Sequence, residues 1–288
     1  MDRADDTPSE PYSDLSSTDE DLGERVSIYQ PEQKGLTFPE IPAFKSVEEE
    51  RLYRKQRLVA ACRAFALHNF DYGFAGHISV RDPERTDLYW TNPMAVHFSQ
   101  VKVSNLILAD HEGNVIEGDY ALNRAGFILH ASVHEAHPDI VAMCHAHTPH
   151  GTAWCSTGKP IDPVNQDACC FFENHAVVND EGGAVTVLAD QGGGVVGAFK
   201  DNRAVLHQAH GILTASRHSV DDAAFWFIAM DRCCQVQLML EAAGQKPPFV
   251  DPERARHSAK HVGSDYIGWL HFQPIYDQVV AANPDMFD

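Results

Sequence analysis

The pattern of apolar and polar residues changes sharply along the chain. Residues 1–24 are mostly Asp, Glu, Ser, Thr and Pro, and ordering them would cost backbone entropy that no buried core offsets. Residues 30–44 carry several prolines among a few apolar residues, which is typical of an extended arm. We therefore expect residues 1–45 to form a disordered acidic tail and an extended arm.

Three later segments repeat apolar residues with the period of a helix. Ser46 and Glu49 have the spacing of a capping box, which predicts a helix over residues 46–69. Apolar residues over 124–136, closed by a following proline, predict a second helix. An Asp-rich first turn opens a third and longer helix over residues 219–243.

Short apolar runs between these helices predict strands. They cover residues 77–81, 88–91, 106–109, 140–145, 184–188 and 204–206, and residues 115–116 return antiparallel after a turn. Strands interleaved with helices describe an α/β sheet with helices on its faces. The sequence therefore predicts one domain over residues 46–245, followed by a C-terminal arm over residues 246–288 that packs on the domain or on a neighbour.

Composition and charge exclude several classes of partner. The chain has 41 Asp and Glu against 22 Lys and Arg, a net charge of -19, which repels nucleic acid and the anionic surface of a membrane. We expect no signal peptide, because the first residues lack the basic segment and the apolar run that a signal peptide has. No later apolar stretch is long enough to cross a bilayer. Its 7 cysteines include two adjacent pairs but no CxxC motif, so we expect reduced thiols and a cytoplasmic location.

The candidate chemistry lies in histidines at the ends of predicted strands. His145 and His147 end an apolar run, and the alternation of an extended backbone directs both imidazoles to the same side. His210 follows another predicted strand and offers a third nitrogen donor. Three imidazoles with an open coordination position suit a divalent cation that polarises a carbonyl, stabilises an enolate or activates water. The competing interpretation is a set of hydrogen-bonded core histidines.

From about Leu52 to Leu240 the sequence resembles the class II aldolase/adducin domain. The matching segments follow in the family's order and are GHISVRDPE (76–84), WTNPMAVHFS (90–99), HPDIVAMCHAHT (137–148), NQD (165–167) and HQAHGILT (207–214). The resemblance implies a three-layer α/β/α fold with a central mixed, largely antiparallel sheet. It also implies a homotetramer, a site near a subunit boundary, and a metal held by His145, His147 and His210.

The chain departs from this family at residues that its sugar-phosphate aldolases use. Those aldolases carry a Ser-Ser-Glu run, whose Glu acts as acid/base, where this chain has Arg124, Ala125 and Gly126. An Asn and a Gly of their phosphate pocket are replaced here by His77 and Ala95. We therefore expect no cleavage of a sugar phosphate in the familiar way. The pattern is most similar to the subgroup that includes iron-dependent oxidative decarboxylases of aminocoumarin pathways.

Several polar residues are candidates to complete the site. His130 lies one turn beyond Gly126 on the predicted helix and is a candidate proton carrier. The alternative is a structural histidine whose ring forms hydrogen bonds with the backbone or with water. Asp167 and Glu173 are candidate catalytic residues from the same or a neighbouring subunit, the alternatives being a turn residue and a solvated carboxylate. The candidate substrate-binding residues are Arg124, His77 and Asn92, and His134 and His137 are expected at the surface.

These features predict a metal-dependent, lyase-type enzyme that acts on a small 2-oxo or hydroxy-carbonyl compound. Retro-aldol cleavage with Zn²⁺ and oxidative decarboxylation with Fe²⁺ both stay open, because three imidazoles suit either ion. A second hypothesis is an adducin-like cytoskeletal scaffold without chemistry. The intact histidines and the absence of a Lys-rich tail argue against it.

Overall fold

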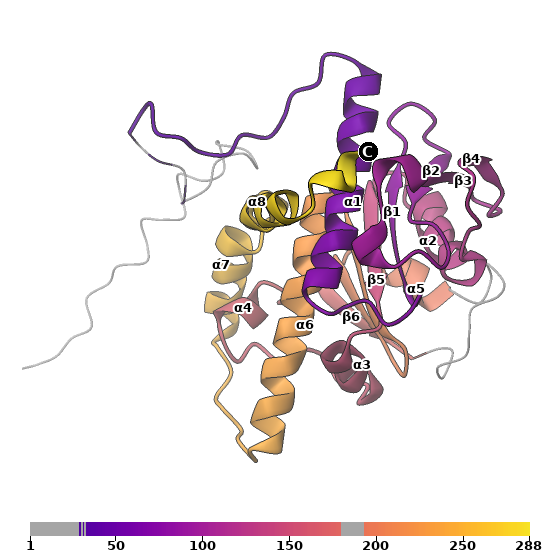
Figure 1. Cartoon of the computed structure of the whole chain (residues 1–288). Coiled ribbons are helices and arrows are strands. Elements are labelled where there is room, and N and C mark those ends of the chain that lie inside the picture. Colours follow the sequence, from indigo (N-terminus) through magenta and orange to yellow (C-terminus); the bar gives the residue numbers. More distant parts are fainter. Residues whose placement is uncertain (1–28, 30, 32, 180–192) are drawn as a thin grey trace, which may run out of the picture. The chain divides into compact units, whose positions relative to one another are not determined.

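The protein is described by a computed structural model that covers residues 29, 31, 33–179 and 193–288. The predicted acidic tail and the predicted strand over 184–188 lie outside these residues. The chain divides into two units, residues 1–38 and 39–288, and every element below belongs to the second (Figure 1). Among the described residues, no helix combines the length and apolarity needed to span a membrane.

The strands form one mixed sheet with the order β4-β3-β2-β1-β5-β8-β7-β6. Every neighbouring pair is antiparallel except β6 and β7, so the expected mixed, largely antiparallel sheet is confirmed. The strands are β1 (Gly76–Arg81), β2 (Leu88–Thr91), β3 (Ile107–Asp110), β4 (Val115–Glu117), β5 (Ala142–Ala146), β6 (His175–Val178), β7 (Ala204–His207) and β8 (Gly211–Ser216).

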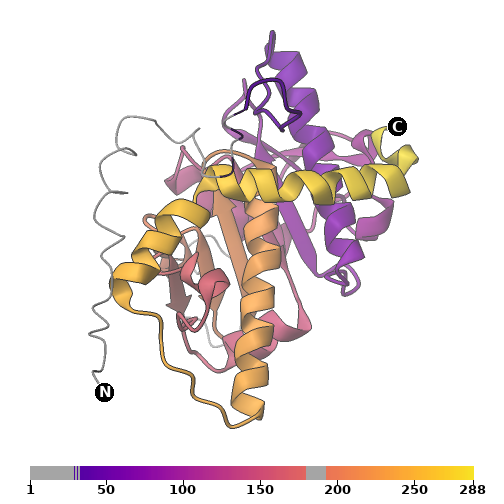
Figure 2. The ribbon, with the colours of Figure 1, turned by 90° about the vertical axis from the view of Figure 1, so that its left-hand side faces the viewer.

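Helices cover both faces of the sheet, which gives the predicted three layers. Helices α1, α3, α6 and α8 pack with one face, while α2 and α5 pack with the other (Figure 1). Figure 2 shows α6 and α8 in front of the sheet. The helices are α1 (Val47–Leu67), α2 (Arg124–Ala136), α3 (Pro149–Ser156), α4 (Gln166–Cys169), α5 (Gly193–Ala198), α6 (Val220–Ala242), α7 (Pro252–Val262) and α8 (Asp265–Ala282), with 3-10 turns at Phe98–Gln100, Val103–Asn105 and Pro284–Phe287.

Alternation along the strands divides their side chains between two cores. Cys144 and Ile212 belong to the larger core under α1 and α6, while Met143 and Leu213 belong to the smaller core under α2 and α5. Strand β1 follows the same alternation. Ile78 and Val80 enter the larger core, and the polar residues that alternate with them, His77, Ser79 and Arg81, face α2. This polar face of β1 supports the site described below.

Local signals explain the predicted helices. Ser46 caps α1 by accepting a hydrogen bond from the Glu49 amide at 3.2 Å, and Asn123 caps α2 in the same way through Gly126. The C-terminal segment differs from its description as an arm, because residues 252–282 form α7 and α8. Phe272 and Val279 of α8 are buried in the larger core. The sequence analysis also did not predict β6 or β8.

Candidate functional site

Three histidines from neighbouring strands converge where β5 ends. His145 lies on β5, His147 lies just beyond it, and His210 lies in the turn between β7 and β8. The turn reaches the end of β5 because β5 pairs with β8. One ring nitrogen of each histidine lies within 4.8 Å of those of the other two. The structure therefore brings together the three side chains that the sequence analysis selected.

The turn that carries His210 has an unusual backbone. Ala209, directly before it, has a φ of 57°, in the left-handed region that residues with a side chain rarely adopt. Such strain costs free energy and persists where the surrounding structure enforces it. The position of His210 is thus imposed by the β7–β8 hairpin.

His145 is held in a single tautomer. Its Nδ1 lies 2.8 Å from the carbonyl oxygen of Ile212, and since a carbonyl only accepts, Nδ1 carries the proton and Nε2 keeps a lone pair. That Nε2 lies 3.1 Å from Nε2 of His210. Burial lowers the pKa of His145 well below its ordinary value and, with repulsion from His147, lowers the pKa of His210 to about 4. Neutral imidazoles that converge in this way fit a divalent cation such as Zn²⁺ or Fe²⁺.

A second group of histidines adjoins this triad on the α2 side of the sheet. His77 of β1 lies opposite His145, with 5.0 Å between the ring centroids. Nε2 of His130 on α2 lies 3.1 Å from Nδ1 of His77. Ser79 Oγ lies 2.8 Å from His130 Nδ1 and 2.9 Å from His134 Nε2. The polar face of β1 is thus paired with histidines of α2.

The expectation that His134 lies at the surface is wrong. The residue is fully buried, because it shares with His130 the face of α2 that packs on β1. Its ring stacks on Tyr89 of β2 at 4.6 Å between centroids. His137, at the end of the helix, is half-buried, and its Nε2 donates to the Val196 carbonyl at 2.7 Å.

The absence of a side chain at Gly126 makes room for His77. An ideal Cβ placed on Gly126 would lie 1.9 Å from Nε2 and 2.0 Å from Cδ2 of His77, well inside any permitted contact. Gly126 belongs to the first turn of α2, so the Nε2–Cδ2 edge of the ring faces the positive end of that helix. The His77 ring therefore occupies the volume that a side chain at position 126 would fill.

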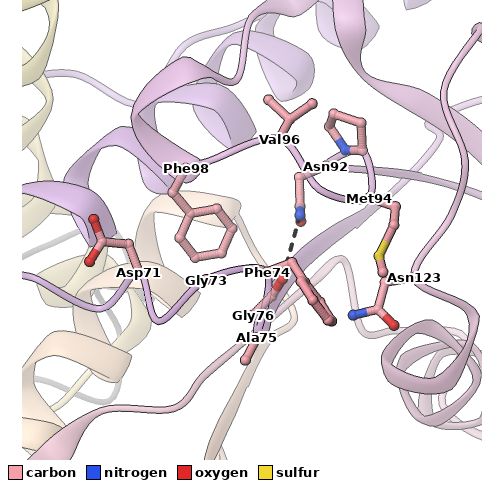
Figure 3. Close-up of a pocket in the computed structure, with 11 residues that line it drawn as sticks. Asp71, Gly73, Phe74, Ala75, Gly76, Asn92, Met94, Val96, Phe98 and Asn123 are labelled. Carbon is pink, nitrogen blue, oxygen red and sulfur yellow. Dashed lines mark hydrogen bonds between the residues drawn. The ribbon is translucent and has the colours of Figure 1, made fainter.

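A small pocket lies beside this arrangement, next to Gly76. Figure 3 shows Asp71 at one end of the pocket and Asn123 at the other, with Phe98 and Met94 between them. Among the described residues, no Lys or Arg lines it, and the one charged residue that does, Asp71, is 3.0 Å from Nε2 of His97. The lining is thus mostly apolar with a few amides and offers no cation to a phosphate.

The comparisons agree with this geometry. Residues 56–238 match the model of the Class II Aldolase and Adducin N-terminal domain. The chain belongs to this family.

Two enzymes of this family from Streptomyces are similar over most of their length. "Decarboxylase NovR" of Streptomyces niveus is 39% identical over 251 residues, which are 86% of this chain and 92% of that protein. The "4-hydroxy-3-prenylphenylpyruvate oxygenase/4-hydroxy-3-prenylbenzoate synthase" of Streptomyces roseochromogenus subsp. oscitans is 39% identical over 247 residues, which are 85% and 88% of the two chains. The resemblance to the decarboxylase subgroup and the expectation of an enzyme are confirmed.

A solved structure supports the fold at similar identity. The L-fuculose 1-phosphate aldolase of Glaciozyma antarctica is 37% identical, with a TM-score of 0.79 over 86% of this chain and 97% of that one. The class II aldolase fold expected from the sequence is therefore confirmed.

The remaining candidate residues of this family member lie in different places. Asn92 braces β1, since its Oδ1 accepts from the Ile78 amide at 3.0 Å and its Nδ2 donates to the Gly76 carbonyl (Figure 3). Arg124 is exposed at the start of α2, two residues before Gly126. Asn92 therefore positions the strand that carries His77, in addition to lining the pocket.

Within one chain, the two candidate carboxylates are not brought to the histidines. Asp167 is exposed on α4, which packs against α6 and α7. Glu173 is exposed and forms an ion pair with Arg256 of α7 at 2.8 Å. A contribution of either residue to a neighbouring subunit's site stays a prediction.

Sequence reasoning missed Ser79 and the inward direction of His134. A signal for both was present, because β1 alternates polar and apolar residues and His130 and His134 are four residues apart on one helix face. The contact between the two elements depends on tertiary packing, which neither local pattern specifies.

Proposed function

We propose that this enzyme uses a divalent cation to cleave a carbon–carbon bond next to the carbonyl group of a small 2-oxo acid with an apolar substituent. The observation that carries the proposal is the convergence of three neutral imidazoles, one of them with its lone pair set by a backbone carbonyl. His145, His147 and His210 would hold the cation. A cation there supplies Lewis-acid stabilisation of the negative charge that develops as the bond breaks.

The residues beside the histidines and the name of one relative suggest which substituent the substrate carries. Phe98 and Met94 offer apolar surface, and no Lys or Arg in the described part of the chain lines the pocket to pair with a phosphate. One Streptomyces relative is named for an aromatic 2-oxo acid, a prenylated phenylpyruvate. Both points favour an aromatic 2-oxo acid over a sugar phosphate.

Other residues have proposed roles around this substrate. Arg124, at the start of α2, would pair with the substrate carboxylate, and His77 would contact the substrate from β1. His130 would act through His77, and Asp167 or Glu173 would enter from a neighbouring subunit of a homotetramer. The seven cysteines are all unpaired thiols, which supports a reducing, cytoplasmic location.

Iron-dependent oxidative cleavage is the second candidate reaction. It is favoured by the word "oxygenase" in the name of one relative, while the aldolase structure favours cleavage without oxygen. Three imidazoles suit both ions, so ligand chemistry does not separate the two reactions.

The test is a comparison of substrates on protein loaded with Zn²⁺ or anaerobically with Fe²⁺. We expect either cleavage of a 4-aryl-4-hydroxy-2-oxobutanoate by the zinc-loaded protein, which breaks the C3–C4 bond to an enolate and an aldehyde, or turnover of 4-hydroxyphenylpyruvate by the iron-loaded protein with O2 as the oxidant. L-fuculose 1-phosphate should not be turned over, and His147→Ala should lose turnover. Oxygen consumption that accompanies turnover by the iron-loaded protein alone would select oxidative cleavage. Turnover of the sugar phosphate alone, or equal turnover in His147→Ala, would overturn the proposal.

A further inference from the structure

A continuous chain of hydrogen bonds runs from the backbone to His77. It starts at the carbonyl oxygen of Ile140, which lies 3.2 Å from His134 Nδ1. From His134 Nε2 it passes through Ser79 Oγ at 2.9 Å and on to His130 Nδ1 at 2.8 Å. It ends at the 3.1 Å contact between His130 Nε2 and His77 Nδ1. We call these five groups the His77 relay.

The relay permits only one arrangement of protons when its histidines are neutral. All three imidazoles are buried and meet no carboxylate along this chain of contacts, so the neutral form with a single ring proton is the one that fits it. The Ile140 carbonyl only accepts, so His134 Nδ1 must donate, and His134 Nε2 must then accept from the Ser79 hydroxyl. Because the Ser79 hydroxyl donates its proton to His134, its oxygen can only accept from His130, so His130 Nδ1 carries a proton. His130 Nε2 is then unprotonated and accepts from His77 Nδ1.

The last member of the relay therefore has a defined lone pair. His77 Nδ1 carries the proton, which leaves Nε2 unprotonated. The Nε2–Cδ2 edge of the ring faces Gly126, where an added Cβ would lie 1.9 Å from Nε2. This is the first turn of α2, whose positive end favours a lone pair over an N–H group. The His77 ring is also 5.0 Å from that of His145, between centroids, so the ring lies beside the candidate metal centre.

We propose that the His77 relay locks His77 in the Nδ1–H tautomer and presents Nε2 as a hydrogen-bond acceptor for a hydroxyl group of the bound ligand. Ser79 and His134 are then positioning residues, since they act on the ligand through His77. The choice of an aromatic 2-hydroxy or enolised 2-oxo acid as this ligand rests on the proposed function. The tautomer itself does not.

The direct test is ¹⁵N NMR of protein that carries ¹⁵N-labelled histidine, recorded without metal or ligand near pH 7. Protonated and unprotonated ring nitrogens resonate in separate ranges, and His77→Asn assigns the signal. We expect His77 with a protonated Nδ1 and a bare Nε2. Ser79→Ala interrupts the relay and should give a mixture of both tautomers. Ser132→Ala on α2, whose hydroxyl donates to Ile128 at 2.9 Å, is the matched control and should keep the wild-type signal.

A protonated Nε2 on wild-type His77, or an unchanged signal in a folded Ser79→Ala variant, would overturn the relay. The wild-type spectrum decides the point even if Ser79→Ala does not fold. Because this measurement uses no substrate, its failure is distinguishable from failure of the proposed reaction.

The acceptor role is tested with two probes on the zinc-loaded protein, phenyllactate and 3-phenylpropionate, which differ in the 2-hydroxyl group. We expect Ser79→Ala to reduce the preference for phenyllactate, the ratio of its affinity to that of 3-phenylpropionate, by about tenfold. This is the effect of losing one hydrogen bond of roughly 1.4 kcal/mol. Ser132→Ala should leave the ratio unchanged. An equal preference in wild type and Ser79→Ala would remove the acceptor role. If neither acid binds, the proposed function fails and the spectrum alone decides the relay.

Discussion

At the scale of single residues, one missing Cβ at position 126 decides how the His77 ring lies. Helices ordinarily lose stability at an interior glycine because its backbone is freer than that of alanine, by about 1 kcal/mol. Here the glycine is required, because the ring of His77 fills the space where a side chain would begin. His77 and Gly126 are thus a complementary pair, and a substitution at either position should affect the other.

We expect Gly126→Ala to lower the free energy of unfolding by about 1–3 kcal/mol, the usual cost of overpacking, despite the better helix propensity of alanine. Gly197→Ala on α5 is the control, since a Cβ there meets no atom within 4 Å, and it should stabilise the protein by up to about 1 kcal/mol. Urea denaturation measures both. If Gly126→Ala stabilised the protein as Gly197→Ala does, the proposed packing of His77 would be wrong.

The buried histidines also predict a dependence of stability on pH. Desolvation lowers the pKa of His134 from 6.5 to about 3, so the unfolded chain binds a proton that the folded chain does not over this window. The stability that neutral His134 contributes is therefore complete above about pH 6.5 and is lost as the pH falls toward 3.

Between pH 7 and pH 5 this one residue should contribute about 2 kcal/mol to the loss. We expect urea denaturation in the presence of a chelator to show a smaller loss over this interval in His134→Gln than in the wild type. Identical losses in the two proteins would show that His134 is not buried in its neutral form.

At the scale of elements, β1 holds α2 in place from both ends of the helix. Near the start of α2, His77 packs against Gly126. At its end, the Arg81 guanidinium donates to the carbonyl oxygen of His134 at 2.6 Å and to that of Ile140, just beyond the helix, at 3.0 Å. The His134 carbonyl belongs to the last turn of α2 and would otherwise lack a helical partner. One strand thus positions the helix through its polar face.

Arg81→Met should lower the free energy of unfolding by about 1–3 kcal/mol, because it leaves the buried carbonyl group of His134 without this donor. Arg256→Met removes an exposed arginine whose ion pair with Glu173 lies in solvent, and it should change little, as exposed pairs generally do. Chemical denaturation compares the two variants. Equal small effects would mean that Arg81 does not hold α2.

At the scale of the whole molecule, caps and turns account for what the sequence predicts well. Helices α1, α2 and α6 begin at capping residues, and strands β1–β5 are short segments between turns. These elements were predicted within a few residues. Strand β8 was missed because a tight hairpin joins it to β7. Helix α8 was missed because Pro274 lies inside it. The triad was predictable from its place at strand ends, whereas the His77–Gly126 contact depends on packing between distant segments.

The burial of α8 has a measurable consequence for the molecule. Phe272 is fully buried among residues of the larger core, so Phe272→Ala should lower the free energy of unfolding by about 3–5 kcal/mol. Phe249, in the exposed segment before α7, is 60% exposed, and Phe249→Ala should change stability by less than about 0.5 kcal/mol. Thermal unfolding of both variants makes the comparison. A minor effect of Phe272→Ala would indicate that α8 is not part of the folded core.

The central claim is that His145, His147 and His210 bind a divalent cation together. The most direct measurement is elemental mass spectrometry of protein purified without chelator, for the wild type and for His147→Ala, with His111→Ala from the exposed turn after β3 as the control. We expect about one Zn or Fe ion per chain in the wild type and the control, and almost none in His147→Ala. Wild-type protein that takes up neither ion, or His147→Ala with the same metal content as the wild type, would contradict the account.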